Sequence, residues 1–312
     1  MNKYWVFAPR LAPQTENLCP GHRACLGCAE ALALRLVMKA AGSDVVVVCA
    51  TGCMEIISSP LPTTNWRVPW IHTLFENTSA VASGVEAGIK VLQRKGKGPD
   101  RPVKILGMGG DGATGDIGIQ ALSGALERGH DFLYVCFDNE AYMNTGIQRS
   151  GSTPYGAMTT TSPPGKMSIG QKTRKKNLVQ IVAAHDIPYV ATACPSYPMD
   201  LMQKVERGLR TPGPAYVHIL SVCPTGWRTK PELAIAHGRL AVQTGVFPLY
   251  EIVHGKYIPT MEIPLKELRP VKDYIKPQGR FRHLKDTDIE EIQKRTIEDY
   301  KKLLKKFKQD RT

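Results

Sequence analysis

The sequence predicts an α/β fold with a doubly wound, mostly parallel sheet and a C-terminal extension. Two apolar runs, residues 103–108 and 132–137, are typical of buried strands, and residues 117–128 between them are compatible with a helix. The elements that continue this alternation are an expected helix at 175–184, a strand at 189–193, a helix at 198–209 and a strand at 215–222. Strands that alternate with helices pair in parallel through crossover connections, so the pattern indicates a sheet with helices on both faces. The 312 residues are enough to bury a substantial core.

The N-terminal part adds a helix, a strand and a second helix. Apolar residues spaced along 31–40 predict an amphipathic helix that ends at Gly42, and the aliphatic run 45–48 predicts a strand. Residues 78–88 are rich in Ala, Ser, Thr and Gly, so we expect a helix packed closely against a neighbouring backbone. A core role is favoured there over contact with a ligand, and Glu76 just before it receives no role.

Polar residues follow two of the expected strands where each one ends. Gly109-Gly110-Asp111-Gly112 comes after the first strand, and Asp138-Asn139 ends the second. The carboxyl ends of neighbouring parallel strands meet at one edge of the sheet, where such folds bind ligands. Asp111, Asn139 and a backbone carbonyl just after Asn139 offer the oxygen ligands that Mg2+ shares with substrate phosphates. The glycines allow the main chain to approach phosphate oxygens, and a helix N-terminus after Thr114 favours negative charge.

Four of the eight cysteines are candidates for one metal centre. Cys25 and Cys28 form a Cys-x-x-Cys pair, whose spacing lets two thiolates grip one metal ion. Cys53 and Cys223 each follow an expected strand, and Cys19 is the main rival for a place in the set. Four thiolates suit an iron–sulfur cluster or a structural zinc, and spacing alone leaves both open. The remaining cysteines are expected in the apolar core: Cys49, Cys136 and Cys194.

Gly-Asp-Gly followed by Asn after a strand–helix–strand interval resembles the thiamine diphosphate motif. The continuation Asp138-Asn139-Glu140-Ala141-Tyr142-Met143-Asn144-Thr145-Gly146 is similar to one branch of that superfamily. The branch is the beta subunit of pyruvate:ferredoxin and related 2-oxoacid:ferredoxin oxidoreductases, with the oxalate enzyme as a close relative. The similarity extends from about Cys19 to Trp227. Its cluster cysteines lie in a Cys-x-x-Cys pair, at a third site further on and before Pro-Thr-Gly-Trp, which matches Cys25, Cys28, Cys53 and Cys223.

The resemblance implies a role for each matching residue. Mg2+ would be held by Asp111, Asn139 and the Ala141 carbonyl, and one [4Fe-4S] cluster by the four cysteines. Asn144 would face the reacting carbon, where an amide can donate a hydrogen bond to a developing oxyanion. The residues assigned to thiamine diphosphate are Glu30, Cys53, Gly110, Asp111, Gly112, Ala113, Asn139, Glu140, Ala141, Tyr142, Met143 and Asn144.

The same resemblance implies oxidative decarboxylation of pyruvate with coenzyme A, with electrons leaving through the cluster to ferredoxin. The thiazolium acts as an electron sink when carbon dioxide leaves. In this family the glutamate that activates the aminopyrimidine lies on an alpha-type partner subunit. The chain is therefore expected to be half of an active site in a hetero-oligomer, together with a ferredoxin-like subunit or domain.

Three alternatives stay open. The same cofactors can act on oxalate without coenzyme A, on a branched-chain 2-oxoacid or on 2-oxoglutarate, although residues 142–146 look more like the pyruvate and oxalate enzymes. A non-redox thiamine diphosphate decarboxylase or synthase would have no use for four clustered thiolates. A zinc-stabilised, basic binding module would have no catalytic role.

Two further segments are expected to form a loop over the site and a C-terminal extension. Residues 151–170 are rich in Ser, Thr, Pro and Gly, and a loop of this length is expected to cover a site or contact another subunit. Residues 1–227 are expected to form the cofactor-binding domain. Residues 228–312, with weak periodicity up to His283, are expected to form an extension on partner subunits. Thr287-Asp288-Ile289-Glu290 resembles a capping box at the start of a final helix.

Charge and hydropathy limit the kinds of partner and the cellular location that we expect for this protein. The net charge of +13, from 41 Lys and Arg against 28 Asp and Glu, suits an acidic partner. Nucleic acid is disfavoured because no helix-turn-helix, zinc-finger or RNA-recognition signature is present. The longest aliphatic run is too short to span a bilayer. The segment Met1 to Trp5 lacks the apolar core of a signal peptide, so a cytoplasmic protein without a disulfide framework is expected.

Overall fold

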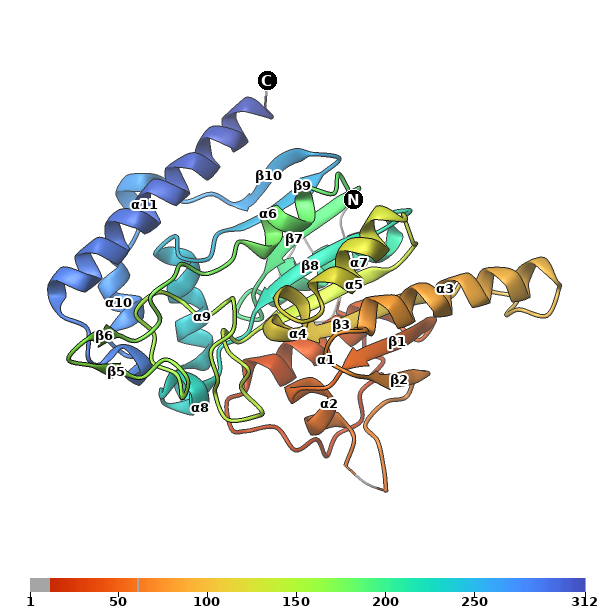
Figure 1. Ribbon diagram of the computed structural model, residues 1–312. Helices are drawn as coiled ribbons and strands as arrows, with labels where there is room; N and C mark the ends of the chain where they lie inside the picture. The colour runs from red at the N-terminus through yellow and green to blue at the C-terminus, as the bar shows by residue number, and fades with distance from the viewer. Residues whose placement is uncertain (1–11, 61, 312) are drawn as a thin grey trace.

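The computed structural model describes residues 12–60 and 62–311, and this part of the chain is built around one eight-stranded sheet (Figure 1). The sheet order is β10-β9-β7-β8-β4-β3-β1-β2. The strands are β1 (Val45–Ala50), β2 (Trp70–Thr73), β3 (Lys104–Gly110), β4 (Leu133–Asp138), β7 (Tyr189–Ala193), β8 (Ala215–Leu220), β9 (Leu249–Val253) and β10 (Lys256–Met261). The segment that carries Met1 to Trp5 lies outside the described residues.

Six of these strands are joined by parallel pairings, and of the eight strands in the sheet β9 runs the other way, because it pairs antiparallel with both β7 and β10. β1, β2, β3, β4, β7 and β8 pair in parallel, whereas β9 pairs antiparallel with β7 and β10 pairs antiparallel with β9. The inner strands β4, β7 and β8 are buried along their whole length because helices cover both faces. The expected doubly wound, mostly parallel sheet is confirmed.

Helices cover the two faces with separate apolar cores. On one face α1 (Ala29–Ala41) packs beside α7 (Pro198–Arg210), and Leu34, Val37, Leu201 and Val205 are buried against the sheet. The other face carries α3 (Thr78–Arg94), α5 (Ile119–Glu127), α6 (Leu178–Ala183) and α11 (Asp286–Gln309). The last of these helices follows the β9–β10 edge of the sheet (Figure 1).

A third core lies at the carboxyl edge of the parallel strands. It joins α8 (Pro224–Trp227), α9 (Ala234–Gln243), α10 (Val271–Ile275) and the start of α11. Trp227 is fully buried in this core and meets Tyr274 edge to face. The smaller elements at this edge are α2 (Cys53–Ser58), α4 (Asp111–Gly115) and a two-stranded hairpin of β5 (Pro164–Gly165) and β6 (Ser168–Ile169).

Several local expectations need correction. The helix expected at 117–128 is found as α5, which begins two residues later, at Ile119. The short helix α4 precedes it, and a side chain at Gly118 between the two helices would overlap the Ala113 carbonyl. The helix that begins nearest to the Gly-Asp-Gly segment is α4, which starts at Asp111, whereas the helix after Thr114 starts at Ile119. The helix expected from Lys175 begins at Leu178, and the last helix begins at Asp286, where the Asp288 carboxylate accepts from the Lys285 amide at 2.8 Å.

Two further differences concern longer segments. Residues 228–283, whose periodicity is weak, contain α9, β9, β10 and α10. In α3, Ser79, Ala82 and Ser83 are buried as expected, but side chains added at Gly84 and Gly88 would meet open space. Only one side of that helix therefore packs closely.

Candidate functional site

The sheet register brings the predicted site residues to one edge. Gly110 is paired with Phe137, so Asp111 and Asn139 leave neighbouring strands at the same level. Asp138 is paired with Leu220, three residues before Cys223. Adjacent carboxyl ends of parallel strands thus form the base of the site, as the sequence predicts.

Asp111 is the most unusual polar group of this edge. The residue is 1% exposed, and its Oδ2 atom accepts a hydrogen bond from the Ser150 hydroxyl. Its Oδ1 atom is buried and has no hydrogen-bond partner in the described part of the chain. Burial and the nearby Asp138 carboxylate raise the pKa of Asp111 well above its usual range. A buried carboxylate oxygen without a partner is costly, so the position fits a bound cation.

Asn139 links three segments that are far apart in the sequence. Its side-chain amide donates to Glu30 Oε2 at 2.9 Å, and its carbonyl accepts from the Trp227 indole at 2.9 Å. Burial raises the pKa of Glu30 to about 7, although hydrogen bonds from Asn139 and from the Met54 amide oppose that shift. Glu30 therefore lies at this edge of the sheet, beside Asn139.

The turn after Asn139 is held at Glu140, whose φ of 69° lies in the left-handed region. Its carboxylate is 2.8 Å from Lys175 Nζ and 2.6 Å from Arg280 Nη2, and Glu140 and Arg280 are each 3% exposed. The Thr153 hydroxyl donates to the Glu140 carbonyl at 2.8 Å. The Glu140 side chain is thus occupied by two cations, and its backbone amide donates to Asp138 Oδ1 at 3.0 Å, so this residue holds the turn in place.

Lys175 also reaches the preceding residue, Asp138. Lys175 Nζ lies 2.6 Å from Asp138 Oδ2, and His218 Nε2 lies 2.8 Å from the same oxygen. Burial tends to raise the pKa of Asp138, but Lys175 and His218 outweigh it and lower the pKa to about 2. Arg280 also stacks on Trp227, with its Cζ atom 4.0 Å from the ring centroid. The turn is therefore rigid before any ligand binds.

Glycine is required where the two loops touch. The Tyr142 hydroxyl donates to the Gly112 carbonyl at 3.2 Å, and a side chain at Gly112 would overlap the Tyr142 ring. At Gly110 an added side chain would meet only the Phe137 carbonyl, at 4.0 Å. The space beside Gly110 is consequently open to a ligand, and Ala113 next to this turn is buried.

Met143 and Asn144 differ in their surroundings. Met143 packs against Gly226, where a side chain would overlap its sulfur atom. Asn144 is exposed and Ala141 is buried between these loops. Met143 thus joins the Asn139 turn to the segment that begins with Cys223.

The four candidate cysteines lie around one end of this edge. Cys28 caps α1, Cys53 begins α2 and Cys223 caps α8, where its sulfur accepts from the Gly226 amide at 3.3 Å. Burial raises the pKa of the Cys53 thiol, and so does the negative charge of Glu30, Cys223, Cys28 and Cys25. Burial likewise raises the pKa of Cys28 to about 12 and that of Cys223 to about 11. Cys53 thus lies within electrostatic range of the other three thiols, and each thiol would have to lose its proton to bind a metal.

The eight cysteines lie in different surroundings. Among residues 12–60 and 62–311 no group of three or more His, Cys, Asp or Glu side chains is already arranged around a metal position. Cys19 accepts from Arg67 Nε at 3.0 Å on a separate segment. The cysteines expected in the core are fully buried: Cys49, Cys136 and Cys194.

The sequence does not indicate the groups that hold the Asn139 turn. Lys175 lies in a run of basic residues that was expected to begin a helix, and Arg280 lies in a region without periodicity. Ser150, which bonds Asp111, stands among many Ser and Thr residues of the following loop. Only the adjacency of Lys175 and Lys176 to this loop could have suggested a role.

Comparison with family models places residues 48–219 in "Thiamine pyrophosphate enzyme, C-terminal TPP binding domain". The pyruvate synthase subunit PorB of Methanocaldococcus jannaschii is 56% identical over 90% of this chain and 94% of its own length. The pyruvate synthase subunit PorB of Methanothermobacter thermautotrophicus is 52% identical over 92% and 96%. The ketoisovalerate oxidoreductase subunit VorB of Pyrococcus horikoshii is 48% identical over 94% of each chain.

A solved structure shares the fold. The 2-oxoglutarate:ferredoxin oxidoreductase from Magnetococcus marinus, solved with 2-oxoglutarate, coenzyme A and succinyl-CoA bound, aligns with a TM-score of 0.58. The alignment covers 92% of this chain and 97% of that one at 18% identity. In the described part of this chain no helix has the length and apolar character needed to cross a membrane.

Proposed function

Because this chain belongs to the thiamine pyrophosphate enzymes, in the family of PorB and VorB subunits of 2-oxoacid:ferredoxin oxidoreductases, we propose that it forms the cofactor-binding half of a pyruvate-oxidising enzyme. The chain is thus a subunit of an oxidoreductase. Coenzyme A is the proposed acyl acceptor and ferredoxin the proposed electron acceptor. The single observation that carries the proposal is the buried Asp111 oxygen, which has no hydrogen-bond partner among the described residues and lies beside the open space at Gly110.

The diphosphate end of the cofactor fits the turn residues. Asp111, Asn139 and the Ala141 carbonyl are the proposed Mg2+ ligands, and Gly110, Gly112 and Ala113 the proposed neighbours of the diphosphate. Lys175 and Arg280 hold the Asn139 turn through Glu140, so these ligands need little reorganisation when the cation binds. Glu30, Tyr142 and Met143 complete the proposed wall of the site.

The redox end fits the cysteines. We propose that Cys25, Cys28, Cys53 and Cys223 hold one [4Fe-4S] cluster, because their thiols interact at the end of the edge that also carries Glu30. When bound, thiamine diphosphate supplies the electron sink for loss of carbon dioxide and the cluster accepts the electrons. Asn144 is exposed and its amide is the proposed donor to the substrate oxygen.

The exposed position of Asn144 also supports a shared site. We propose that an alpha-type subunit covers this edge and supplies the glutamate that activates the aminopyrimidine, and that a ferredoxin-like subunit takes the electrons. Residues 1–227 are the proposed cofactor-binding domain, and the exposed side of residues 228–312 is a proposed contact with partner subunits.

Pyruvate is the preferred substrate because the two pyruvate synthase subunits described above are 56% and 52% identical to this chain, whereas the ketoisovalerate subunit is 48% identical. The similarity to the ketoisovalerate subunit makes a branched-chain 2-oxoacid the second candidate. The same fold and site residues serve either substrate, since the substrate contacts are expected mainly on the partner.

The test is made on the native complex, purified without oxygen. Iron, sulfide and thiamine are measured per copy of this chain, and reduction is recorded with pyruvate, 2-ketoisovalerate and oxalate. Thiamine, four iron atoms for the cluster of this chain and reduction by pyruvate are expected. Reduction by another oxoacid alone would change the substrate, whereas zinc in place of iron or the lack of thiamine would refute the proposed function.

A further inference from the structure

A tight turn, residues 150–153, contacts both strand ends that form the base of the site. Its sequence is Ser-Gly-Ser-Thr. The Thr153 amide donates to the Ser150 carbonyl at 3.2 Å, and the Ser150 amide donates to the Thr153 hydroxyl at 3.0 Å. Both residues are fully buried. Their hydroxyls are therefore held in fixed positions, and we call this segment the 150–153 turn.

Each of these hydroxyls bonds a different strand end. The Ser150 hydroxyl donates to Asp111 Oδ2, directly after β3. The Thr153 hydroxyl donates at 2.8 Å to the carbonyl of Glu140, two residues beyond the end of β4. Because both bonds come from one turn, that turn sets where the Asp111 carboxylate lies relative to the Asn139 turn.

Two buried polar atoms at this turn have no hydrogen-bond partner within residues 12–60 and 62–311: Asp111 Oδ1 and the Ser152 hydroxyl. Ser152 is 1% exposed, and its amide donates to the Ser150 hydroxyl oxygen at 3.1 Å. Both residues with an unsatisfied atom therefore bond the same hydroxyl group. Unsatisfied buried polar atoms are uncommon in folded proteins, so a pair of them around Ser150 fits a polar ligand bound beside the turn.

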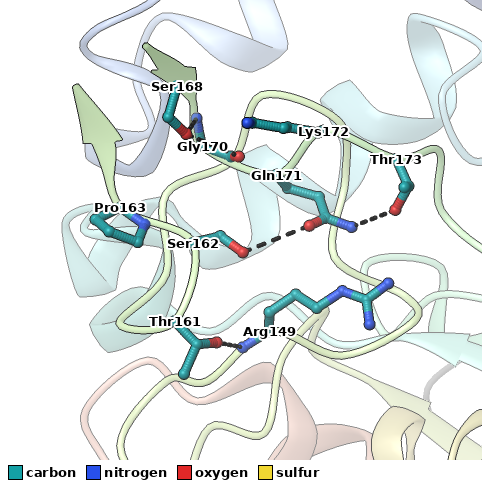
Figure 2. A pocket seen from close by; sticks show the side chains of 9 residues that line it. All are labelled: Arg149, Thr161, Ser162, Pro163, Ser168, Gly170, Gln171, Lys172 and Thr173. Atoms are coloured by element: carbon teal, nitrogen blue, oxygen red, sulfur yellow. Dashed lines mark hydrogen bonds between the residues drawn. The ribbon is translucent and has the colours of Figure 1, made fainter. Parts of the chain in front are cut away.

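Neighbouring segments brace the turn. The Gly151 amide donates to Asp116 Oδ2 at 2.8 Å, and the Gly151 carbonyl accepts from the Lys176 amide at 2.8 Å. Lys176 Nζ in turn lies 2.6 Å from Asp116 Oδ1. Figure 2 shows the residue before the turn, Arg149, whose amide donates to the Thr161 hydroxyl at 2.8 Å. The turn is therefore rigid without any contribution from a bound ion.

The Ser150 bond decides how many oxygens Asp111 can offer to a cation. It occupies Oδ2 and leaves Oδ1, so the carboxylate is limited to one oxygen. Mg2+ takes ligands at about 2.0–2.1 Å in a near-octahedral shell. Ca2+ takes about six to eight oxygens at about 2.3–2.6 Å and often binds both oxygens of a carboxylate. A single carboxylate oxygen in a fixed position suits the smaller ion.

We propose that Ser150 is a positioning residue that makes Asp111 a one-oxygen ligand and thereby makes the cation site selective for Mg2+ over Ca2+. Thr153 holds the Asn139 turn in the matching position. The inference rests on the proposed function, which assigns a diphosphate-bound cation to Asp111. It adds the origin of the ion's identity, which the ligand types leave open because carboxylate and carbonyl oxygens suit both ions.

The test measures ion selectivity in the assembled complex after a chelator has removed the cation and the cofactor. Calorimetry with saturating thiamine diphosphate gives the Kd for Mg2+ and for Ca2+ in the wild type and in Ser150→Ala. We expect the Mg2+ affinity to fall about tenfold or more, as is usual when a group that orients a metal ligand is lost. The Ca2+ affinity should change less than about threefold, because the freed carboxylate can bind with both oxygens. The preference for Mg2+ should therefore shrink.

Two further variants keep the test independent of folding. Ser150→Cys keeps the size of the side chain with a weaker donor, so a smaller shift in the same direction is expected even if the alanine variant does not assemble. In an Asp111→Asn background, Ser150→Ala should not change the selectivity further, because the carboxylate that Ser150 directs is gone. A remaining effect of the same size would mean that Ser150 acts through another group and would overturn the inference.

The matched control is Ser196→Ala, which also removes a buried serine hydroxyl. Ser196 is 6% exposed and its hydroxyl donates to the Ile235 carbonyl at 2.9 Å. The Kd values of this variant for both ions should match the wild type. Equal losses for Mg2+ and Ca2+ in Ser150→Ala, or no loss, would overturn the inference. A wild-type complex that binds neither ion with thiamine diphosphate would refute the proposed function and the inference together, and this result is recognised before any variant is made.

Discussion

At the scale of single residues, the site keeps groups that cost stability. A buried carboxylate oxygen without a hydrogen bond is unfavourable in the folded chain. Within residues 12–60 and 62–311, Asp111 carries such an oxygen next to a second carboxylate. Such a group is explained by what it binds and not by what it stabilises. Cofactor affinity and stability should therefore respond in opposite directions when Asp111 is changed.

Asp111→Asn tests that expectation. The cofactor-free chain should be as stable as the wild type or more stable by about 1 kcal/mol, because one buried charge is removed. Binding of thiamine diphosphate in the presence of Mg2+ should fall about a hundredfold or more, since a charged ligand becomes neutral. Urea unfolding and calorimetry measure the two effects. A variant that loses stability and keeps its affinity would show that Asp111 has a structural role.

Gly112→Ala tests the contact between the two loops. The added methyl group would overlap the Tyr142 ring, so the free energy of unfolding should fall by about 1 to 3 kcal/mol. Gly84→Ala is the matched control, because its methyl group points into open space on helix α3 and should stabilise the chain by about 0.5 to 1 kcal/mol. Equal effects in urea unfolding would mean that Tyr142 moves aside freely.

At the scale of elements, the sequence predicts those parts that depend on local patterns. The strand at 189–193 is found at those bounds, and Asp111 and Asn139 meet because any right-handed crossover places neighbouring strand ends together. Lys175 and Arg280 could not be predicted, because their roles follow from tertiary contacts with Glu140 across 35 and 140 positions of sequence. The helix predicted at 117–128 is found at Ile119–Glu127, whereas the short helix Asp111–Gly115 is not predicted, because five residues are too few for a periodic apolar pattern.

The short 3-10 helix Gly279–Phe281, which supplies Arg280, should therefore matter for cofactor binding. Arg280→Gln leaves Glu140 with Lys175 alone and should lower the free energy of unfolding by about 3 kcal/mol. The affinity for thiamine diphosphate with Mg2+ should fall as well, and Arg280→Lys should restore part of it, because the charge is kept and the stacking on Trp227 is lost.

The control for this element is its exposed neighbour. Arg282→Gln should change the free energy of unfolding by less than about 0.5 kcal/mol and leave the cofactor affinity unchanged. A double-mutant cycle with Glu140→Gln measures the coupling directly. No coupling between positions 140 and 280 would refute the view that Arg280 holds the Asn139 turn.

At the scale of the whole molecule, the C-terminal region is part of the chain's own core. Phe307 is 1% exposed and meets Tyr250 edge to face, and the Tyr300 hydroxyl bonds both the amide and the carbonyl of Ile263 at 3.0 Å. Helix α11 is therefore anchored without a partner. A contact with partner subunits, as proposed for residues 228–312, would use the opposite, lysine-rich side of the helix.

Phe307→Ala distinguishes a helix anchored on its own chain from an arm held by a partner. The isolated chain should lose about 3 to 5 kcal/mol of unfolding free energy, because a buried aromatic ring is removed. Leu265→Ala, at a position that is 41% exposed, should cost far less. Equal unfolding midpoints for the two variants in guanidinium chloride would contradict the anchored helix.

The bond between Glu140 and Arg280 also sets an order of events during synthesis. Glu140 leaves the ribosome long before Arg280, since 140 positions separate them. The nascent chain can form the parallel strands around the Asn139 turn while the second cation is still missing. The Glu140–Arg280 ion pair cannot form until the C-terminal segment emerges. A translation product truncated before Arg280 would therefore contain the parallel strands but lack this ion pair at the proposed cofactor site.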